Sequence, residues 1–414
     1  MNIWIVNHYA VPPSIASGMV RHFYFARYLQ EKGHKVKIIT SGRVHNTDIN
    51  MIKDDSLFLS KVMDGVEYIF VRSHGYTGNG VNRIINMMGF PFEVRKTMKR
   101  LLKEERPDVI YTSSPDIFVP FFAMKFGKKR RFPVVFEVRD LWPESIVEYN
   151  GMSRKNPIIR ILYRLEKWMY KNASQLIFTF PGGSEYITDQ KWEKAVDLQK
   201  VNYINNGVDL QEYRKRQREK LNDPDLTNDK FRIIYMGSIR KVNNIELLVS
   251  VAAELQKRGE DGIQFLIYGD GTEKEKLEES CKAQGLANII FKGRVEKRYI
   301  PYILSKSSLN LLNYKVSSTW KYGGSQNKQF EYLASGRPTC SNVKMGHSII
   351  EQYKCGLERD MSTIDEYIET ILYYKNMKKE EYEQQCKNAF LAAEDFDYNR
   401  LAEKVEKVLI KTQN

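Results

Sequence analysis

Short apolar runs alternate with amphipathic runs along nearly the whole chain. In the first half, the apolar runs have the length and composition of strands, and the runs between them carry apolar residues at helical spacing. The predicted strands are Asn2–His8, Lys35–Thr40, Val66–Arg72, Asp108–Thr112, Val134–Val138 and Gln175–Phe180, and the predicted helices include Val20–Lys32, Arg83–Glu105 and Pro157–Asn172.

The same alternation starts again after residue 230 and ends in a charged helical segment, Thr363–Lys411. Apolar strands that alternate with helices are typical of parallel sheets covered on both faces. Two such series predict an α/β protein of two doubly wound domains. The predicted strands of the second series are Phe231–Met236, Ile263–Tyr268, Asn288–Lys292 and Leu309–Asn313, and its helices are Asn244–Lys257, Glu273–Gln284 and Asn327–Ala334.

The join between the two series falls in Asn205–Lys230, which contains a polar run with Pro224 and no apolar periodicity, typical of a linker or an exposed helix and loop. We therefore expect a first domain over 1–204 and a second over 205–397, with the terminal helix, about 398–414, packing back on the first. A chain of 414 residues is too long for one ordinary core, which agrees with two domains.

The net charge of +14 is unevenly distributed, because residues 1–210 carry 31 Lys and Arg against 21 Asp and Glu. A basic first half favours an anionic partner: nucleic acid, an anionic membrane face or a phosphorylated substrate. The sequence lacks both a bilayer-spanning apolar run and a secretory signal pattern. The spacing of the four cysteines fits reduced thiols, so we expect a protein that stays inside the cell.

Ligands of open α/β sheets bind where loops lead from strand ends into helix N-termini. Gly18 follows the first strand and is expected to open a helix at Met19, although a plain connection is an equal alternative. After the strand at 231–236, Gly237, Arg240 and Lys241 suit a diphosphate, with solvated charges as the alternative. For Gly269, in a G-D-G turn, a structural role is favoured.

The segment YGGSQNKQFEYLASGRP carries the densest signal. Ser325 or Gln326 starts a helix, and Gly336 ends it. Lys328 in the first turn opposes the helix dipole, so local stability does not explain it. Glu331 lies on the same face and can accept hydrogen bonds from sugar hydroxyls, with a surface ion pair to Lys328 as the alternative.

The loop after Val134–Val138 reads RDLWPE and crowds Arg139, Asp140 and Glu144 at the end of a strand. Charged residues there usually have a function, although either carboxylate is also a candidate helix cap.

Taken in chain order, these motifs resemble the GT-B-fold glycosyltransferases of family four, which are retaining enzymes that use nucleotide-sugar donors. The resemblance covers nearly the whole chain, and its closest branch builds bacterial surface polysaccharides, including lipid-linked O-antigen and capsule units made by N-acetylfucosaminyl- and N-acetylglucosaminyltransferases. The motifs are the Gly18 loop, RDLWPE at Arg139–Glu144, NGVD at Asn206–Asp209, GSIRK at Gly237–Lys241, YGDGTEKEKLE at Tyr268–Glu278, FKGRV at Phe291–Val295 and NKQFEYLASGRP at Asn327–Pro338.

The resemblance implies GT-B architecture, with two Rossmann-like domains facing across a cleft, and a role for each matching residue. Glu331 is expected to hold the donor ribose, and Arg294 and Val295 to line the base pocket. The implied diphosphate ligands are Arg240, Lys241 and Lys328, and Asp140 is the candidate on the acceptor side. The implied catalytic residues are Asp140, Lys328 and Arg240, and the donor-binding set also includes Gly18, Gly237, Gly269, Ser325 and Asn327.

One departure stands out: the family places two glutamates eight positions apart, and this chain has Gly323 at the first of them. Backbone amides around Gly324–Gln326, or Asn327, are candidates to replace it. No cofactor and no metal site is expected, because the Asp-x-Asp pairs at Asp223–Asp225 and Asp395–Asp397 do not follow strands. Cations and helix dipoles are expected to neutralise the diphosphate.

The function expected from the resemblance is transfer of an N-acetylated amino sugar, from a UDP-linked donor to a polyprenyl-diphosphate-linked acceptor. The alternatives are a nucleotide-sugar 2-epimerase of the same fold, a catalytically inactive scaffold and a basic nucleic-acid-binding protein. The chain has no nucleic-acid-binding motif, so nucleic acid is not an expected partner.

The first domain is expected to contact the anionic inner face of the cell membrane. Val81–Lys103 mixes apolar residues with six cations and one acid, and Lys128–Arg131 follows apolar Phe118–Phe126. Such a mixture is typical of an interfacial contact. The alternative is that the apolar residues of Val81–Lys103, among them Met87, Phe90 and Phe92, belong to the core.

Overall fold

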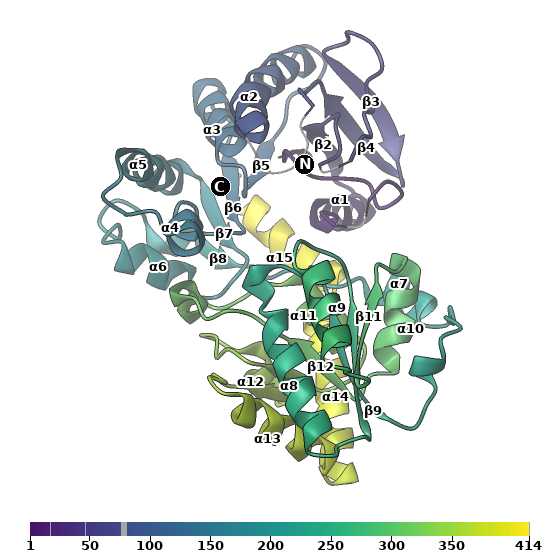
Figure 1. Ribbon diagram of the computed structural model, residues 1–414. Helices are drawn as coiled ribbons and strands as arrows, with labels where there is room; N and C mark the ends of the chain where they lie inside the picture. The colour runs from purple at the N-terminus through teal and green to yellow at the C-terminus, as the bar shows by residue number, and fades with distance from the viewer. Residues whose placement is uncertain (17, 46, 76–80, 414) are drawn as a thin grey trace. The chain divides into compact units, whose positions relative to one another are not determined.

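The computed structural model describes residues 1–16, 18–45, 47–75 and 81–413, which divide into two compact units (Figure 1). Unit 1 comprises Met1–Asn205 and Tyr398–Asn414, and unit 2 comprises Asn206–Asp397. Each unit contains one mainly parallel sheet with helices on its faces, so both are Rossmann-like.

The sheet of unit 1 has the strand order β3-β4-β2-β1-β5-β6-β7-β8. All neighbouring pairs are parallel except β3 and β4. The central strands are almost fully buried, as their continuous apolar runs require. The strands are β1 (Asn2–Val6), β2 (Lys35–Ser41), β3 (Phe58–Met63), β4 (Val66–Val71), β5 (Val109–Ser113), β6 (Val134–Val138), β7 (Gln175–Phe178) and β8 (Val201–Tyr203).

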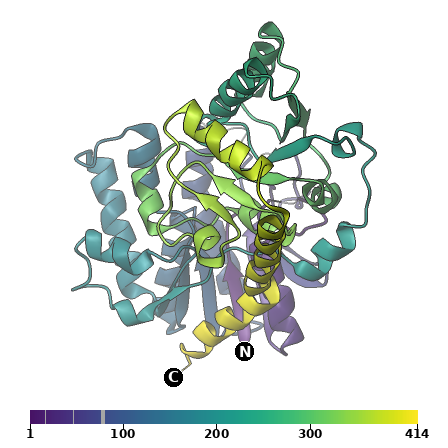
Figure 2. The ribbon, with the colours of Figure 1, turned by 90° about the horizontal axis from the view of Figure 1, so that it is seen from below.

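Helices cover both faces of this sheet. Because β-α-β crossovers are right-handed, α1, which leads toward β2, lies on the face opposite to α2 and α3, which lead toward β5 and β6. The C-terminal helix α15 packs against α1, and the two chain ends lie near each other (Figure 2). The helices are α1 (Arg21–Glu31), α2 (Val81–Leu101), α3 (Phe118–Arg130), α4 (Glu144–Asn150), α5 (Pro157–Asn172), α6 (Gly183–Asp189) and α15 (Tyr398–Ile410).

The sheet of unit 2 is parallel throughout, in the order β11-β10-β9-β12-β13-β14. The core of this unit joins the apolar sides of β9, β10 and β12 to α8 and α13. The strands are β9 (Phe231–Met236), β10 (Ile263–Tyr268), β11 (Ile289–Gly293), β12 (Leu309–Leu312), β13 (Thr339–Ser341) and β14 (Gly356–Glu358).

The helices of unit 2 largely follow the predicted ranges, and α11 begins and ends at the predicted residues. Gly336 follows α11 with φ +63°, the left-handed conformation expected of a residue that ends a helix. The helices are α7 (Leu210–Arg216), α8 (Ile245–Lys257), α9 (Lys274–Ala283), α10 (Ile300–Ser305), α11 (Asn327–Ala334), α12 (Ile349–Tyr353), α13 (Ile364–Lys375) and α14 (Lys379–Asp395).

Two helix starts concern regions that the sequence left open or placed differently. The join contains α7, in line with the helix-and-loop alternative, and its first turn is capped because Asp209 accepts a hydrogen bond from the Glu212 N–H at 2.8 Å. The helix expected to open at Met19 begins instead at Arg21, with Val20 as the residue before it.

The sequence reading also missed sheet edges. Strands β8, β13 and β14 have three residues each, too few for a periodic signal. Strand β3 lies at an edge and is mostly exposed, so its sequence does not alternate between apolar and polar residues. Among the described residues, no helix combines the length and apolar composition needed to cross a membrane.

Candidate functional site

The chain order in unit 2 reverses between β9 and β12, which makes this point the expected ligand position of a doubly wound sheet. The loops that follow these two strands are joined by Asn313. Its side-chain amide donates hydrogen bonds to the carbonyls of Asn243 at 2.8 Å and Asn244 at 2.7 Å. The same loops carry GSIRK and the segment that leads into α11, so the fold brings these two motifs together.

Helix α11 starts at this switch point without a side-chain cap and without an acidic residue in its first turn. Gln326 is the residue before the helix. The first N–H groups of a helix have no intrahelical partner, so this N-terminus can bind an anion. The approach to it runs through Gly323, whose φ of +95° favours glycine.

Lys328, in the first turn of α11, is half-buried beside these amides. Its Nζ donates a hydrogen bond to the Tyr235 hydroxyl at 3.1 Å and lies 4.2 Å from the centre of that ring. Tyr314 supplies a second ring at 4.9 Å. Because these partners are uncharged, burial lowers the pKa of Lys328 to about 7. Lys328 forms no ion pair with Glu331, so the alternative of a surface pair between these two residues is wrong.

The loop from Gly237 completes this environment. A Cβ built on Gly237 would lie 3.2 Å from Lys328 Nζ. The structure therefore brings together Lys328, Gly237 and the start of α11, three features that sequence reasoning assigned to one diphosphate site. A cation beside free N–H groups is a suitable arrangement for a phosphate.

Glu331, one turn further along α11, is half-buried. Its carboxylate forms no hydrogen bond or ion pair with the residues that the structure describes. Burial raises its pKa, and the charges of Lys297 and Arg216 partly oppose that rise. An unsatisfied carboxylate at this depth can accept hydrogen bonds from hydroxyl groups of a ligand.

Gly269, in the G-D-G turn after β10, lets two loops approach closely. A Cβ at this position would lie 1.8 Å from the Gly237 carbonyl oxygen, and φ is +137°. The Gly237 N–H donates to the Tyr268 carbonyl at 2.9 Å. The G-D-G turn thus supports the loop beside Lys328 through the backbone, which matches the structural role favoured from the sequence.

The remaining donor-side candidates are more exposed. Arg240 and Lys241 lie in the loop after β9, with both side chains in solvent. Arg294, also exposed, pairs with Asp270 at 3.1 Å, and Val295 beside it is half-buried. A pair this exposed contributes little to stability, so these cations are available to a ligand.

Ser325 and Asn327 flank Gln326 at the start of α11. The Asn206 side chain donates to the Ser325 carbonyl at 2.5 Å, and the Asn206 N–H donates to Ser325 Oγ at 3.0 Å. Asn206 is the first residue of the NGVD motif, so one physical role of that motif is to fix the approach to α11. Asn327 is exposed as the first helical residue.

Neither Asp-x-Asp pair forms an obvious cation site. Asp223 and Asp225 both accept hydrogen bonds from Lys292 Nζ, at 2.8 and 2.5 Å. Asp395 accepts a hydrogen bond from the Tyr353 hydroxyl at 2.6 Å. Within the described part of the chain, no cluster of three or more His, Cys, Asp or Glu side chains is arranged to hold a metal ion.

Two of the candidate residues, Gly18 and Asp140, belong to unit 1. Gly18 is exposed, and a Cβ built there would meet no atom within 4 Å. Asp140 is exposed in the loop after β6, and no side chain caps α4. The alternative that Asp140 or Glu144 caps this helix is therefore wrong. Glu144 is buried and accepts a hydrogen bond from the Tyr163 hydroxyl at 2.5 Å.

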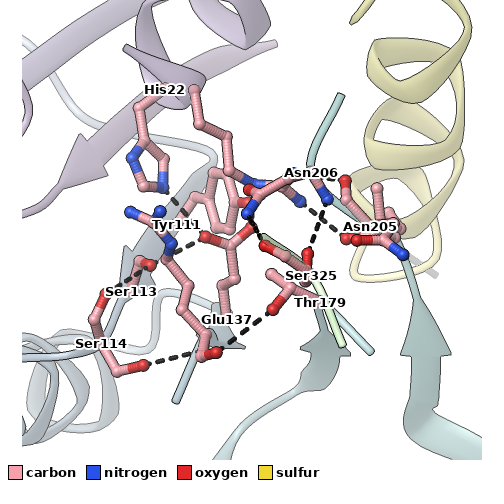
Figure 3. A network of polar contacts seen from close by, with 12 residues as sticks. His22, Tyr111, Ser113, Ser114, Glu137, Thr179, Asn205, Asn206 and Ser325 are labelled. Carbon is pink, nitrogen blue, oxygen red and sulfur yellow. Dashed lines mark hydrogen bonds and ion pairs between the residues drawn. The ribbon is translucent and has the colours of Figure 1, made fainter. Parts of the chain in front are cut away.

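A buried polar network beneath this loop escaped sequence reasoning (Figure 3). Glu137 of β6 is fully buried and accepts hydrogen bonds from Arg21 Nε at 2.9 Å, from Ser113 Oγ at 2.8 Å and from the Tyr111 hydroxyl. The His22 ring lies 3.2 Å from the same carboxylate. The positive charge of Arg21 helps to hold the pKa of Glu137 well below its ordinary value, against the effect of burial. The only sequence signal was a charged residue inside an apolar strand.

The apolar residues expected at a membrane divide between two environments. Met87 and Phe90 are buried, which supports the core alternative for these two. Met88 and Phe92 are 56% and 51% exposed. Ile84 and Ile85, which the prediction also covers, have side chains outside the described set.

Family models match both halves of the chain. The family model "Glycosyltransferase Family 4" matches residues 16–212, and "Glycosyl transferases group 1" matches residues 216–392. A stretch of 97 residues is 32% identical to alpha-D-kanosaminyltransferase of Streptomyces kanamyceticus. That match covers 23% of this chain and a quarter of the relative.

Solved structures share the fold over almost the full chain. Sucrose-phosphate synthase from Thermosynechococcus elongatus is 15% identical, with a TM-score of 0.75 and 98% of each chain covered. HepE of Anabaena, in complex with UDP, is 14% identical, with a TM-score of 0.66 and coverage of 99% of this chain and 100% of its own. The chain therefore consists of a family 4 glycosyltransferase domain followed by a group 1 glycosyltransferase domain, and it has the GT-B fold.

Proposed function

We propose that the protein transfers a sugar, with retention of anomeric configuration, from a UDP-sugar to a polyprenyl-diphosphate-linked acceptor in surface polysaccharide synthesis. The observation that carries this proposal is the position of Lys328, an ammonium without a carboxylate partner at the uncapped start of α11. Such an arrangement is incomplete without an anion, and the diphosphate of a nucleotide sugar supplies one.

The other donor-side residues have roles that fit their surroundings. Glu331 accepts hydrogen bonds from the ribose hydroxyls, which its lack of partners supports. Arg294 and Val295 line the base pocket. Arg240 and Lys241 are exposed cations at the carboxyl end of β9 and add to the charge that faces the diphosphate. Gly237, Gly269, Ser325 and Asn327 shape the loops around the phosphates.

The reaction breaks the bond between the anomeric carbon and the diphosphate oxygen, and it forms a bond from that carbon to an acceptor oxygen. The leaving diphosphate gains negative charge as the bond breaks. Lys328 and the free N–H groups of α11 stabilise that charge more strongly in the transition state than in the bound donor. The acceptor hydroxyl passes its proton to the departing diphosphate oxygen, or to a carboxylate on the acceptor side, as it attacks.

Retention is compatible with two routes: a covalent intermediate on a carboxylate, or departure and attack on the same face of the sugar. Asp140, exposed in unit 1, is the acceptor-side candidate for assisting the attack. No residue of unit 2 stands out as a nucleophile. The acceptor is presented at the cytoplasmic membrane face, which the basic character of residues 1–210 supports.

The identity of the donor is inferred from the similarity of this chain to other glycosyltransferases. UDP is supported by the related fold of HepE of Anabaena, which was solved in complex with UDP. An N-acetylated amino sugar is inferred from the resemblance to the surface-polysaccharide branch. Gly323, where the family has its first glutamate, leaves recognition of the sugar to backbone groups of 324–326 or to Asn327.

The test is incubation of the full chain with a panel of UDP-sugars, with and without polyprenyl-diphosphate-linked acceptors, and mass spectrometry of the products. Product formation that requires both substrates is the expected result. Conversion of the donor sugar without acceptor would identify a 2-epimerase instead. Absence of turnover with every donor, together with absence of UDP binding by calorimetry, would overturn the proposal.

A further inference from the structure

A cavity of about 440 Å³ opens between α2 and α3 of unit 1, outside the residues proposed to bind the donor. Its lining is unusual in charge, because it combines cations with aromatic rings and contains no carboxylate. The lining residues are Arg95, Lys99, Phe122, Lys125, Phe126, Lys129 and Arg130.

Each of the two helices contributes an apolar stretch followed by a basic one along a single face. On α2, Met88 and Phe92 precede Arg95 and Lys99, at spacings of four, three and four residues. On α3, Phe122 precedes Lys125 and Lys129 at spacings of three and four. These spacings keep side chains on one face of a helix.

The apolar parts of the two helices meet beside the cavity. The Phe92 and Phe122 rings pack edge to face, with centres 4.9 Å apart. Phe92 is nevertheless 51% exposed and Met88 is 56% exposed. The exposed ring of Phe92, packed on Phe122 of the cavity lining, therefore presents apolar surface next to the cationic cavity.

The five cations are not explained by ion pairing. None of them forms an ion pair with a carboxylate among the residues that the structure describes. Lys99, Lys129 and Arg130 lie in the last turns of their helices, where the helix dipole favours a cation. That effect does not account for Arg95 or Lys125, nor for the way both helices direct cations to one cavity.

We propose that this cavity binds the phosphate head group of an anionic membrane phospholipid, with the acyl chains lying over Phe92, Phe122 and Met88. The cations supply the charge complement and hydrogen-bond donors of a phosphate, and the adjoining rings supply an apolar surface for the chains. The inference deepens the membrane location in the proposed function and rests on it. It differs from a diffuse basic surface in assigning the binding to particular side chains.

The experiment is co-sedimentation of the full chain with vesicles of phosphatidylcholine alone or mixed with phosphatidylglycerol. The cavity variant is Lys99→Glu with Lys129→Glu. A same-helix control, Arg100→Glu with Lys128→Glu, makes an equal change of charge outside the cavity lining. A second control, Lys404→Glu with Lys407→Glu, lies on α15, on the α1 side of the sheet.

The wild type is expected to bind the mixed vesicles and not phosphatidylcholine alone. The cavity variant should bind more than about 25-fold more weakly, because each of the two lost cations contributes about fivefold and each introduced carboxylate adds repulsion from the anionic surface. The same-helix control should lose clearly less affinity for the mixed vesicles, and the α15 control should bind them as the wild type does. If charge reversal lowers the melting temperature, Lys99→Gln with Lys129→Gln replaces the cavity variant. Its loss of vesicle affinity should be smaller than that of the charge reversal but still larger than the loss in a same-helix control with the matching Gln substitutions.

Equal losses in the cavity and same-helix variants would overturn the inference in favour of a diffuse patch. Full displacement from vesicles by inorganic phosphate, but not by chloride at equal ionic strength, would also overturn it and indicate a site for free phosphate. Turnover of a UDP-sugar with a water-soluble acceptor distinguishes the two proposals. If the wild type turns over the donor but the cavity substitutions leave vesicle binding unchanged, only this inference fails. If the wild type shows no turnover, the proposed function fails.

Discussion

The Nζ atom of Lys328 lies 3.1 Å from the hydroxyl oxygen of Tyr235 and stands over the ring of the same residue. This contact positions a lysine at the start of a helix, where the dipole disfavours it, by means of an uncharged partner. The cation is therefore held in place without being neutralised. A bound diphosphate would supply the missing negative charge.

The first prediction concerns pH. Burial lowers the pKa of Lys328 to about 7, so above that pH the side chain loses its charge in the empty site. A bound diphosphate favours the ammonium and raises its pKa again. Donor binding should consequently weaken as pH rises, with the Kd of a UDP-sugar increasing on the order of tenfold between pH 7 and 8.5. Calorimetric titration across this range is the measurement.

Two variants separate Lys328 from other titrating groups. Lys328→Arg keeps its charge at all these pH values, so its Kd should be nearly independent of pH. Lys328→Met should bind weakly throughout and lower kcat further, because the diphosphate gains charge in the transition state. Unchanged pH dependence in both variants would rule out Lys328 as the titrating group.

The second prediction concerns Glu331, whose carboxylate has no partner in the empty site. Glu331→Ala should raise the donor KM and lower kcat/KM by roughly ten- to a hundredfold, the effect of losing a charge-assisted hydrogen bond of ~1.5–3 kcal/mol. Steady-state kinetics with the UDP-sugar and its 2′-deoxyribose analogue provide the check. If Glu331 binds the ribose, the variant should discriminate between the two donors less than the wild type does.

These two residues also show what the sequence can reveal. Lys328 was recognisable because its type conflicts with its position in a helix, and Glu331 because its spacing follows from helical periodicity. Gly237 and Gly269 were recognisable as turn residues. Their closeness in space, which leaves no room for a Cβ on Gly269 because it would lie 1.8 Å from the Gly237 carbonyl oxygen, depends on the pairing of β9 with β10. Contacts between distant loops need the sheet order, which the pattern of apolar residues does not specify.

Glu137 shows what the sequence does not reveal. Its partners Arg21 and Tyr111 lie 116 and 26 positions away in the chain, so no local spacing connects them. The α/β class and most strand positions followed from periodicity, whereas the short and exposed edge strands did not. The Arg21–Glu137 pair depends on α1 and β6 meeting in three dimensions.

The third prediction concerns chelation. Activity is expected to persist in EDTA, because Lys328 and the start of α11 can stabilise the leaving group, and because Lys292 already occupies the carboxylates of Asp223 and Asp225. The measurement is turnover before and after dialysis against EDTA. Loss of activity with recovery on addition of Mg²⁺ or Mn²⁺ would indicate a metal requirement.

The fourth prediction concerns the close approach of two loops. Gly269→Ala places a methyl group against the Gly237 carbonyl at a φ of +137°, so the loop beside Lys328 must move. The variant should unfold at a lower temperature and bind UDP more weakly. Gly262→Ala is a suitable control, because its nearest atom would lie 3.6 Å away and its φ is ordinary. Equal effects of the two substitutions on unfolding temperature and UDP binding would contradict the role of Gly269 in supporting the loop beside Lys328.

The last prediction concerns stability in unit 1. Glu137→Gln removes a buried charge and leaves the Arg21 guanidinium without its ion-pair partner, which should cost about 3–5 kcal/mol in free energy of unfolding. Glu254→Gln, which breaks an exposed pair with Arg258, should lower the free energy of unfolding far less, because solvent screens that pair. The depressed pKa of Glu137 also gives the effect a pH dependence: the stabilisation is present above the ordinary value of 4.5 and is lost as pH falls below it. Urea unfolding of both variants and the wild type at neutral and acidic pH should therefore show a stability gap that narrows in acid, by a much larger amount for Glu137→Gln than for Glu254→Gln, whose exposed carboxylate has a pKa that its hydrogen bond with Arg258 also lowers.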